Sequence, residues 1–129
     1  MRLLLDTHAA VWAVASPERL SGSVAEAIAD TSNEIFVSVA SLWEIAIKFS
    51  LGRKQAPPFD AEAALTFFHE TGFALLDITP AHVVAVGKLA IEHSDPFDRL
   101  LIAQALTEPM VLVSKDQKIA ACLPQLTLW

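Results

Sequence analysis

Short apolar runs that alternate with segments of helical periodicity constrain this fold more than any other feature of the sequence. Runs of this kind, free of a polar alternation, are typical of strands that are buried on both faces of a parallel sheet. The predicted strands are Leu3–Leu5, Ile35–Val39, Phe73–Leu76, Met110–Val113 and, at the end of the chain, Leu126–Leu128.

The segments between these runs carry helix signals. Predicted helices cover Ala9–Ala15, Leu20–Asp30, Ser41–Leu51, Ala61–Thr71, Pro80 to about Glu92, Phe97–Leu106 and Lys115–Leu123. Asp60 and Thr79 are expected N-caps, and Gly52 and Gly72 are expected helix stops. Strands alternating with helices predict an α/β fold, a three-layer α/β/α sandwich with a central, mostly parallel sheet of four to five strands. We expect one domain over residues 1–129.

Composition excludes several classes of protein. Of the 129 residues, 53% are apolar and 19% charged, so a disordered chain is excluded. The net charge of −6 and the absence of a polybasic run argue against nucleic-acid binding by electrostatic attraction alone. The single cysteine, Cys122, excludes an internal disulfide and a Cys-rich zinc site, and we expect it to be buried. No apolar run approaches the ~20 residues of a membrane span, and we expect a cytoplasmic protein.

Acidic residues gather at predicted element ends. Asp6 follows the first strand, Asp116 follows the fourth, and Glu44 lies in the first turn after the second. Asp95 and Asp98 open another helix. Because sites in parallel α/β sheets form beyond the carboxyl ends of the strands, these five acids are candidates for one site.

Each acid also has a purely structural explanation. Asp6, Asp95 and Asp116 are suitable N-caps, and Asp98 in a first turn interacts favourably with the helix dipole. Ser41 and Glu44 have the spacing of a capping box, and Glu44 can pair with Lys48 one turn later. Taken singly, each acid is better explained by helix capping than by catalysis.

Taken together, the acids favour a metal site. Two carboxylates ~4 Å apart repel by about 4 kcal/mol at an effective dielectric near 20, and a divalent cation removes that repulsion. Oxygen ligands without cysteine favour Mg²⁺ or Mn²⁺ over Zn²⁺. Acidic clusters with such ions are a common solution for cleaving phosphodiesters.

Four segments of the chain then show a family resemblance. The sequence resembles PIN-domain ribonucleases, most closely the VapC-type toxins of VapBC toxin–antitoxin systems. The matching segments are Leu4-Leu5-Asp6-Thr7-His8, Ser41-Leu42-Trp43-Glu44-Ile45-Ala46-Ile47-Lys48 with Leu51-Gly52-Arg53, Asp95-Pro96-Phe97-Asp98-Arg99-Leu100-Leu101-Ile102-Ala103, and Val113-Ser114-Lys115-Asp116.

The resemblance implies a PIN-like fold and a set of site residues. Catalytic and metal-binding roles fall on Asp6, Glu44, Asp98 and Asp116, with supporting roles for Thr7, Ser114 and Asp95. It also implies an endoribonuclease that uses Mg²⁺, with Mn²⁺ as a substitute, and hydrolyses single-stranded or loop RNA to leave a 5′-phosphate and a 3′-hydroxyl. Such an enzyme inhibits growth as a toxin. Implied partners are an RNA substrate, a small VapB-type antitoxin and a second copy of the chain in a homodimer.

A few basic side chains lie near the predicted site. Arg53, Lys54, Arg99 and His8 are candidates for RNA contacts. The alternatives are a solvated turn for Arg53 and Lys54, a salt bridge with Asp98 for Arg99, and a capping or packing role for His8.

Three other functions compete with the nuclease. A phosphohydrolase with Asp6 as nucleophile needs a second aspartate two residues later, where this chain has His8. A phosphoacceptor receiver domain needs adjacent acids after the first strand, and Asp6 has no acidic neighbour. A binding module in which the acids only cap helices stays open, and a metal titration separates it from a nuclease.

Overall fold

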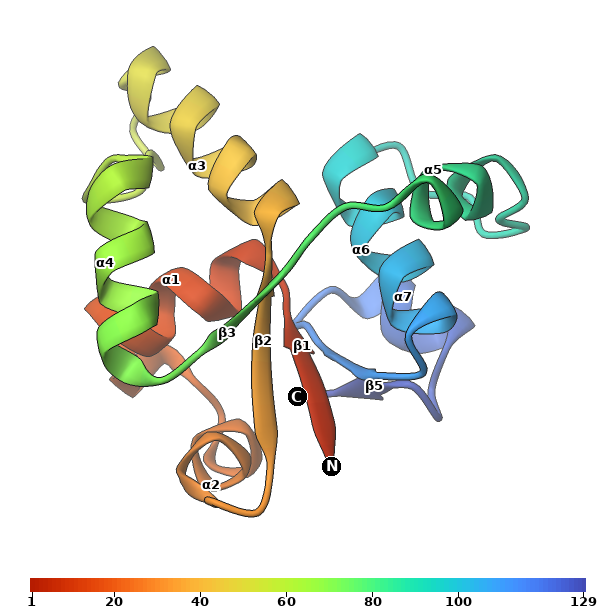
Figure 1. Cartoon of the computed structure of the whole chain (residues 1–129), viewed down its shortest axis with the longest axis horizontal. Helices are drawn as coiled ribbons and strands as arrows, with labels where there is room; N and C mark the ends of the chain where they lie inside the picture. Colours follow the sequence, from red (N-terminus) through yellow and green to blue (C-terminus); the bar gives the residue numbers. More distant parts are fainter.

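A five-stranded parallel sheet forms the centre of the protein. The computed structural model describes residues 1–129. Its strands are β1 (Arg2–Leu5), β2 (Glu34–Ser38), β3 (Ala74–Leu76), β4 (Val111–Val113) and β5 (Thr127–Leu128). They lie in the order β3-β2-β1-β4-β5, and every neighbouring pair is parallel (Figure 1). The predicted parallel sheet is therefore confirmed.

Helices cover both faces of this sheet and complete three layers. One face carries α1 (Thr7–Ala15), α2 (Gly22–Ala29), α3 (Val39–Leu51) and α4 (Ala61–Thr71), and the other carries α5 (Pro80–Gly87), α6 (Pro96–Thr107) and α7 (Gln117–Cys122). A short 3₁₀ turn, Pro17–Arg19, joins α1 to α2. None of these helices combines the length and the apolarity that a membrane crossing requires.

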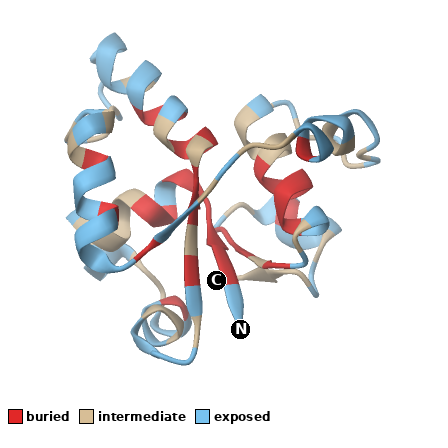
Figure 2. Ribbon diagram, viewed as in Figure 1, coloured by how far each residue is buried: buried red, intermediate tan, exposed pale blue.

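Alternating side chains of β1 supply the two halves of the core. Leu3 and Leu5 pack with Phe68 and Ile45 on the α1–α4 face, whereas Leu4 packs with the α6 side chains on the other. All three leucines are fully buried, as the red centre of Figure 2 shows. Burial of both faces explains why the strand runs in the sequence are continuous and apolar.

Some element boundaries differ from the sequence expectation. Helix α3 begins at Val39, because the Ser38 hydroxyl accepts a hydrogen bond from the Ala40 amide and caps the helix. The predicted capping box of Ser41 and Glu44 is therefore wrong, because both residues lie within the helical segment and not at its start. Helix α5 ends at Gly87, short of Glu92. Cys122 is exposed, not buried, because the six-residue α7 buries only Ile119.

The strand order brings distant parts of the chain to one edge of the sheet. From β1 the chain builds outward through β2 and β3, then crosses to β4 on the opposite side of β1. All five carboxyl ends point the same way because the strands are parallel. The chain reverses its direction of growth between β1 and β4, which is where sites in such sheets form.

Candidate active site

Asp6 lies at the centre of the candidate site, directly after β1. Its amide donates to the Val113 carbonyl at 3.0 Å, which joins the ends of β1 and β4. Its carboxylate caps α1 by accepting from the Ala9 amide at 2.8 Å. The residue is only 7% exposed. Burial raises the pKa of the Asp6 carboxyl above its usual value, against the opposing effect of the Ser114 hydroxyl and the Ala9 amide. A buried acid of this kind favours a nearby cation.

Glu44 is held by a hydrogen-bonded group of side chains between α1 and α3. Its Oε1 lies 2.6 Å from the Thr7 hydroxyl, which lies 3.0 Å from the Ser41 hydroxyl. Since a hydroxyl has one proton, Thr7 donates to the carboxylate and accepts from Ser41. The second oxygen of Glu44 pairs with the Lys48 ammonium one turn later, as predicted. Glu44 is 3% exposed, so these contacts fix its orientation.

Lys48 is the cation of this group. Burial alone acts to lower the pKa of the Lys48 ammonium, but its bond to Glu44 and the charges of Glu44, Asp95 and Asp98 outweigh that effect and raise it. Lys48 on α3 and the two acids at the start of α6 therefore lie within electrostatic reach of one another.

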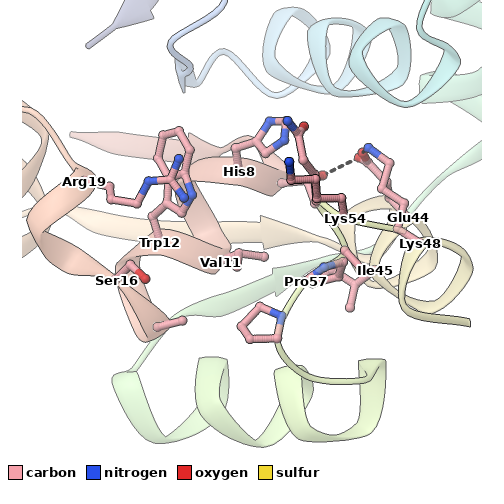
Figure 3. A pocket seen from close by; sticks show the side chains of 15 residues that line it. His8, Val11, Trp12, Ser16, Arg19, Glu44, Ile45, Lys48, Lys54 and Pro57 are labelled. Atoms are coloured by element: carbon pink, nitrogen blue, oxygen red, sulfur yellow. Dashed lines mark hydrogen bonds and ion pairs between the residues drawn. The ribbon is translucent and has the colours of Figure 1, made fainter. Parts of the chain in front are cut away.

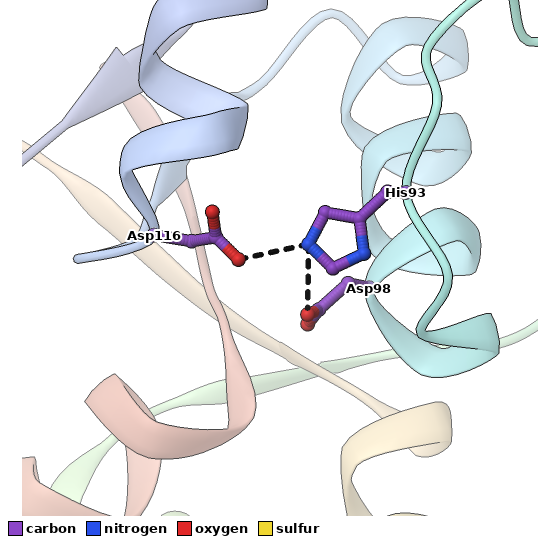
Figure 4. A group of neighbouring side chains, drawn as sticks. All are labelled: His93, Asp98 and Asp116. Carbon is purple, nitrogen blue, oxygen red and sulfur yellow. Dashed lines mark hydrogen bonds and ion pairs between the residues drawn. The ribbon is translucent and has the colours of Figure 1, made fainter.

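His93, Asp98 and Asp116 converge on the other side of the site (Figure 4). The Nε2 atom of His93 lies 2.8 Å from Asp116 Oδ2 and 3.5 Å from Asp98 Oδ2. The Nδ1 atom accepts from the Asp95 amide at 3.2 Å, which places the ring proton on Nε2. His93 therefore donates to the carboxylates and holds together two acids that come from α6 and from the turn after β4.

The charge state of Asp98 reports how strongly the acids interact. Burial, followed by the charges of Asp95 and Asp6, raises the pKa of the Asp98 carboxyl to about 7, and Glu44 adds to this shift. Asp116 behaves differently. Burial acts to raise its pKa, but the hydrogen bonds from His93 and from the amides of Ile119 and Lys118 lower it overall.

These properties fit a divalent cation. Burial and several like charges destabilise the ionised form of Asp98, and a positive ion next to it would offset that repulsion. One carboxylate oxygen each of Asp98 and Asp116 lies within 4.8 Å of the other and of His93 Nε2, a spacing that one ion held by the two carboxylates can span. Carboxylate oxygens suit Mg²⁺ and Mn²⁺.

Two further residues predicted to support the site make local contacts there. Asp95 is the N-cap of α6, where its Oδ1 accepts from the amides of Phe97 and Asp98. The Ser114 hydroxyl accepts a hydrogen bond from the Asp116 amide at 3.1 Å. Its hydrogen bond with Asp6 acts to lower the pKa of the Asp6 carboxyl. Through these contacts Asp95 fixes the start of α6, which carries Asp98, and Ser114 fixes the backbone at Asp116.

The four basic candidates fall in different places. Lys54 and His8 line a pocket that also contains Thr7 and Glu44. Arg53 is exposed and makes no side-chain hydrogen bond or ion pair, in agreement with a solvated turn. Arg99 is not free for the predicted RNA contact, because its guanidinium donates to the carbonyls of Ile91 and Val86.

Arg99 thus corrects the sequence expectation. It forms no salt bridge with Asp98, and its guanidinium donates to the Val86 carbonyl in the last turn of α5 and to carbonyls in the loop that follows. We therefore assign it to holding this loop. The loop carries His93, so Arg99 acts on the site through the placement of that histidine.

His93 itself was missed by the sequence analysis. It was not among the predicted site residues, because it lacks metal-ligand spacing with His69 and His82. Its partners Asp98 and Asp116 are five and 23 residues away, the second on a different element. The one available signal was its position two residues before the capping residue Asp95, where the chain must turn.

Comparison with known proteins identifies relatives over nearly the whole chain. Residues 3–122 match the PIN domain family. The chain is 33% identical over 122 residues to Ribonuclease VapC22 of Mycobacterium tuberculosis, which covers 91% of this chain and 88% of that protein.

Solved structures share the fold at lower identity. VapBC2 from Rickettsia felis, solved with a DNA fragment from its promoter, superimposes with a TM-score of 0.73 at 18% identity and covers 99% of this chain and 98% of that one. VapC20 of Mycobacterium tuberculosis, a toxin that cleaves the sarcin–ricin loop, gives a TM-score of 0.62 at 16% identity, with 93% and 94% covered. At these identities the likeness establishes the PIN-like fold alone.

Proposed function

The chain belongs to the PIN-domain family, and from this premise we propose that it is a metal-dependent endoribonuclease, the toxin of a type II toxin–antitoxin pair. The ribonuclease relative, 33% identical over most of both chains, supports the activity. We propose the whole of residues 1–129 as one catalytic domain.

One observation carries the proposal most strongly. The pKa of Asp98 is raised to about 7 by burial, then by the charge of the neighbouring Asp95, and then by those of Asp6 and Glu44, which are distant in the sequence. Helix capping does not require this, since Asp98 caps no helix and its carboxylate lies near His93. A fold that concentrates negative charge in a half-buried hollow is suited to cation binding.

We propose that Asp6, Asp98, Asp116 and Glu44 hold the ion, Mg²⁺ with Mn²⁺ as a substitute. The bound cation would supply neutralisation of the phosphoryl oxygens and a lower pKa for the attacking water. Thr7 and Lys48 fix the Glu44 carboxylate, which takes a proton from that water. His93 and Ser114 orient Asp116. In-line attack by water leaves a 5′-phosphate and a 3′-hydroxyl and needs no covalent enzyme intermediate.

We further propose single-stranded or loop RNA as the substrate, and a small VapB-type antitoxin and a second copy of the chain as protein partners. The solved neighbours from Rickettsia felis and from Haemophilus influenzae are VapBC structures, which supports the antitoxin. Eleven large apolar side chains are exposed, among them Trp43 at 56% and Leu51 at 53% on α3, and such surface favours protein partners.

End mapping of cellular RNA tests this function. Wild type and Asp98→Asn are induced in parallel, with Asp77→Asn as a control that changes an exposed aspartate outside the site. We expect new 5′-phosphate ends with wild type and with Asp77→Asn, and none above background with Asp98→Asn. Equal cleavage by all three proteins would contradict the proposal and indicate a contaminating ribonuclease.

A further inference from the structure

A pocket beside the candidate active site has no role in the mechanism above (Figure 3). It lies between α1 and the loop that follows α3, and it has a volume of about 360 Å³. Thr7 and Glu44 form part of its wall, so the pocket borders the group of acids through Glu44. A substrate that reaches the carboxylates therefore has room to extend into it.

The charge of this pocket is opposite to that of the protein. Its lining includes the basic side chains of Arg19, Lys48 and Lys54, against the single acid Glu44. The whole chain carries a net charge of −6. A local excess of positive charge next to an acidic site attracts a polyanion that passes between the two, which is the property of a phosphodiester chain.

An aromatic platform closes one end of the pocket. The guanidinium carbon of Arg19 lies 4.4 Å from the centre of the Trp12 ring, and the His8 ring lies 5.7 Å from it. Arg19 is exposed, so the guanidinium plane is available to a ligand. Bases of single-stranded RNA stack on aromatic rings and on arginine planes.

Between this platform and Glu44 lie two hydrogen-bond donors. Lys54 and His8 project into the middle of the pocket in the view of Figure 3. Neither Lys54 nor His8 makes a side-chain hydrogen bond or an ion pair within the protein, so both are free for a ligand. Their position suits a phosphate or a ribose that links a stacked base to the acidic hollow.

The far wall is built by the loop between α3 and α4. Pro57 and Pro58 restrict its backbone, and the Ala56 amide closes a turn on the Arg53 carbonyl at 2.8 Å. Phe59 anchors the loop, because its ring packs edge-on against Phe67 at 5.2 Å. A wall that is fixed in advance lowers the entropic cost of ligand binding.

We propose that this pocket binds the nucleotide adjacent to the scissile phosphate. Its base stacks on the outer face of the Arg19 guanidinium, which itself lies over the Trp12 ring, and its backbone contacts Lys54 and His8. Gln55 also lines the pocket, and because a glutamine side chain both donates and accepts hydrogen bonds, it is the residue we assign to base selection. The volume lies at the small end of the range for ligand sites, about 300–1,000 Å³, so the pocket takes one nucleotide. The position relative to the cleaved bond rests on the proposed ribonuclease function.

Binding is tested first without metal, so that the result does not depend on catalysis. AMP, GMP, CMP and UMP are titrated up to about 10 mM in EDTA, a range that detects millimolar dissociation constants. The readout is the NMR signal of the Trp12 indole N–H. We expect at least one nucleotide to shift it, with roughly fivefold or greater weakening in Arg19→Ala and Lys54→Ala. Lys88→Ala, an exposed lysine on the other face, is the matched control and should bind as wild type does.

Cleavage of a short RNA with each base in turn beside the cut supplies the second test. Arg19→Ala should lower kcat/KM roughly fivefold or more, and Gln55→Ala should change the preferred base at that one position. Unchanged kinetics in both variants with normal cleavage would overturn the subsite and leave the ribonuclease intact. Nucleotide binding without any RNA cleavage would overturn the ribonuclease function and leave a nucleotide-binding pocket. If the Trp12 signal shifts with none of the four nucleotides but does shift with the antitoxin, the pocket is a protein-docking site and the proposal is refuted.

Discussion

Replacing Asp98 with asparagine should stabilise the metal-free protein at alkaline pH. The side chain is 24% exposed, and burial followed by the charges of Asp95 and Asp6 raises its pKa from 3.8 to about 7. A shift of roughly three units corresponds to a penalty of at most about 4 kcal/mol for the ionised form. Because part of the side chain is in contact with water, we expect about half of that, about 2 kcal/mol. Asparagine has the same shape and carries no charge, so Asp98→Asn removes this penalty.

The pH dependence of the effect has a definite sign. The pKa is higher in the folded state than in the unfolded state, so the folded protein holds this proton more tightly. The penalty is absent below about pH 4, grows as the pH rises, and is complete above about pH 7. The advantage of Asp98→Asn should therefore be largest at pH 8 and fall to less than half of that at pH 5.

Urea unfolding in EDTA measures the difference in free energy of unfolding between variant and wild type. A parallel series with saturating Mn²⁺ should reverse its sign, because ligand binding stabilises wild type by about 2.7 kcal/mol at a hundredfold excess over Kd and stabilises Asp98→Asn less. Asp77→Asn should stay within about 0.5 kcal/mol of wild type throughout. An Asp98→Asn variant that is no more stable than wild type in EDTA at pH 8 would refute the proposed cost of ionising Asp98.

Three further substitutions probe the residues around the acids. Thr7→Val keeps the shape of the side chain but removes the donor to the buried Glu44 carboxylate, so we expect a loss of about 1–3 kcal/mol by urea unfolding and a lower kcat, with Thr7→Ser restoring both. Arg99→Lys cannot span the carbonyls of Val86 and Ile91, and we expect a loss of about 1–2 kcal/mol with faster amide exchange in the loop after α5, whereas unchanged exchange would contradict the assigned role. His93→Ala should cost about 1 kcal/mol in EDTA and less with Mn²⁺, since the cation then separates the carboxylates; an equal cost in both conditions would show that His93 acts independently of the metal site.

The sheet and most helix starts could be predicted because their signals are local. Asp60, Thr79 and Asp95 cap the helices that the sequence assigned to them, and the apolar runs became parallel strands. The start of α3 could not be chosen in this way. Ser38 and Ser41 are three residues apart and both are good caps, and the choice depends on packing that turns Ser41 toward Thr7.

The site was predictable only in part for the same reason. The resemblance and the strand-end positions pointed to the four acids, but which atoms face one another depends on tertiary structure. Asp6 and Asp116 each cap a helix and also face the hollow, so the capping explanation and the site explanation apply to the same residues. His93 and Arg99 depend on the fold of the loop after α5, which has no periodicity that a sequence analysis could use.

The central claim is that acids from four separate elements form one cation site. Anomalous X-ray diffraction from Mn²⁺ in crystals of the wild-type protein tests it directly. The claim predicts a manganese peak at direct coordination distance from carboxylate oxygens of Asp6, Asp98 and Asp116 and next to the Glu44 carboxylate, which disappears in Asp98→Asn. Saturating Mn²⁺ that gives no peak in this hollow, or peaks only at unrelated surface acids, would contradict it.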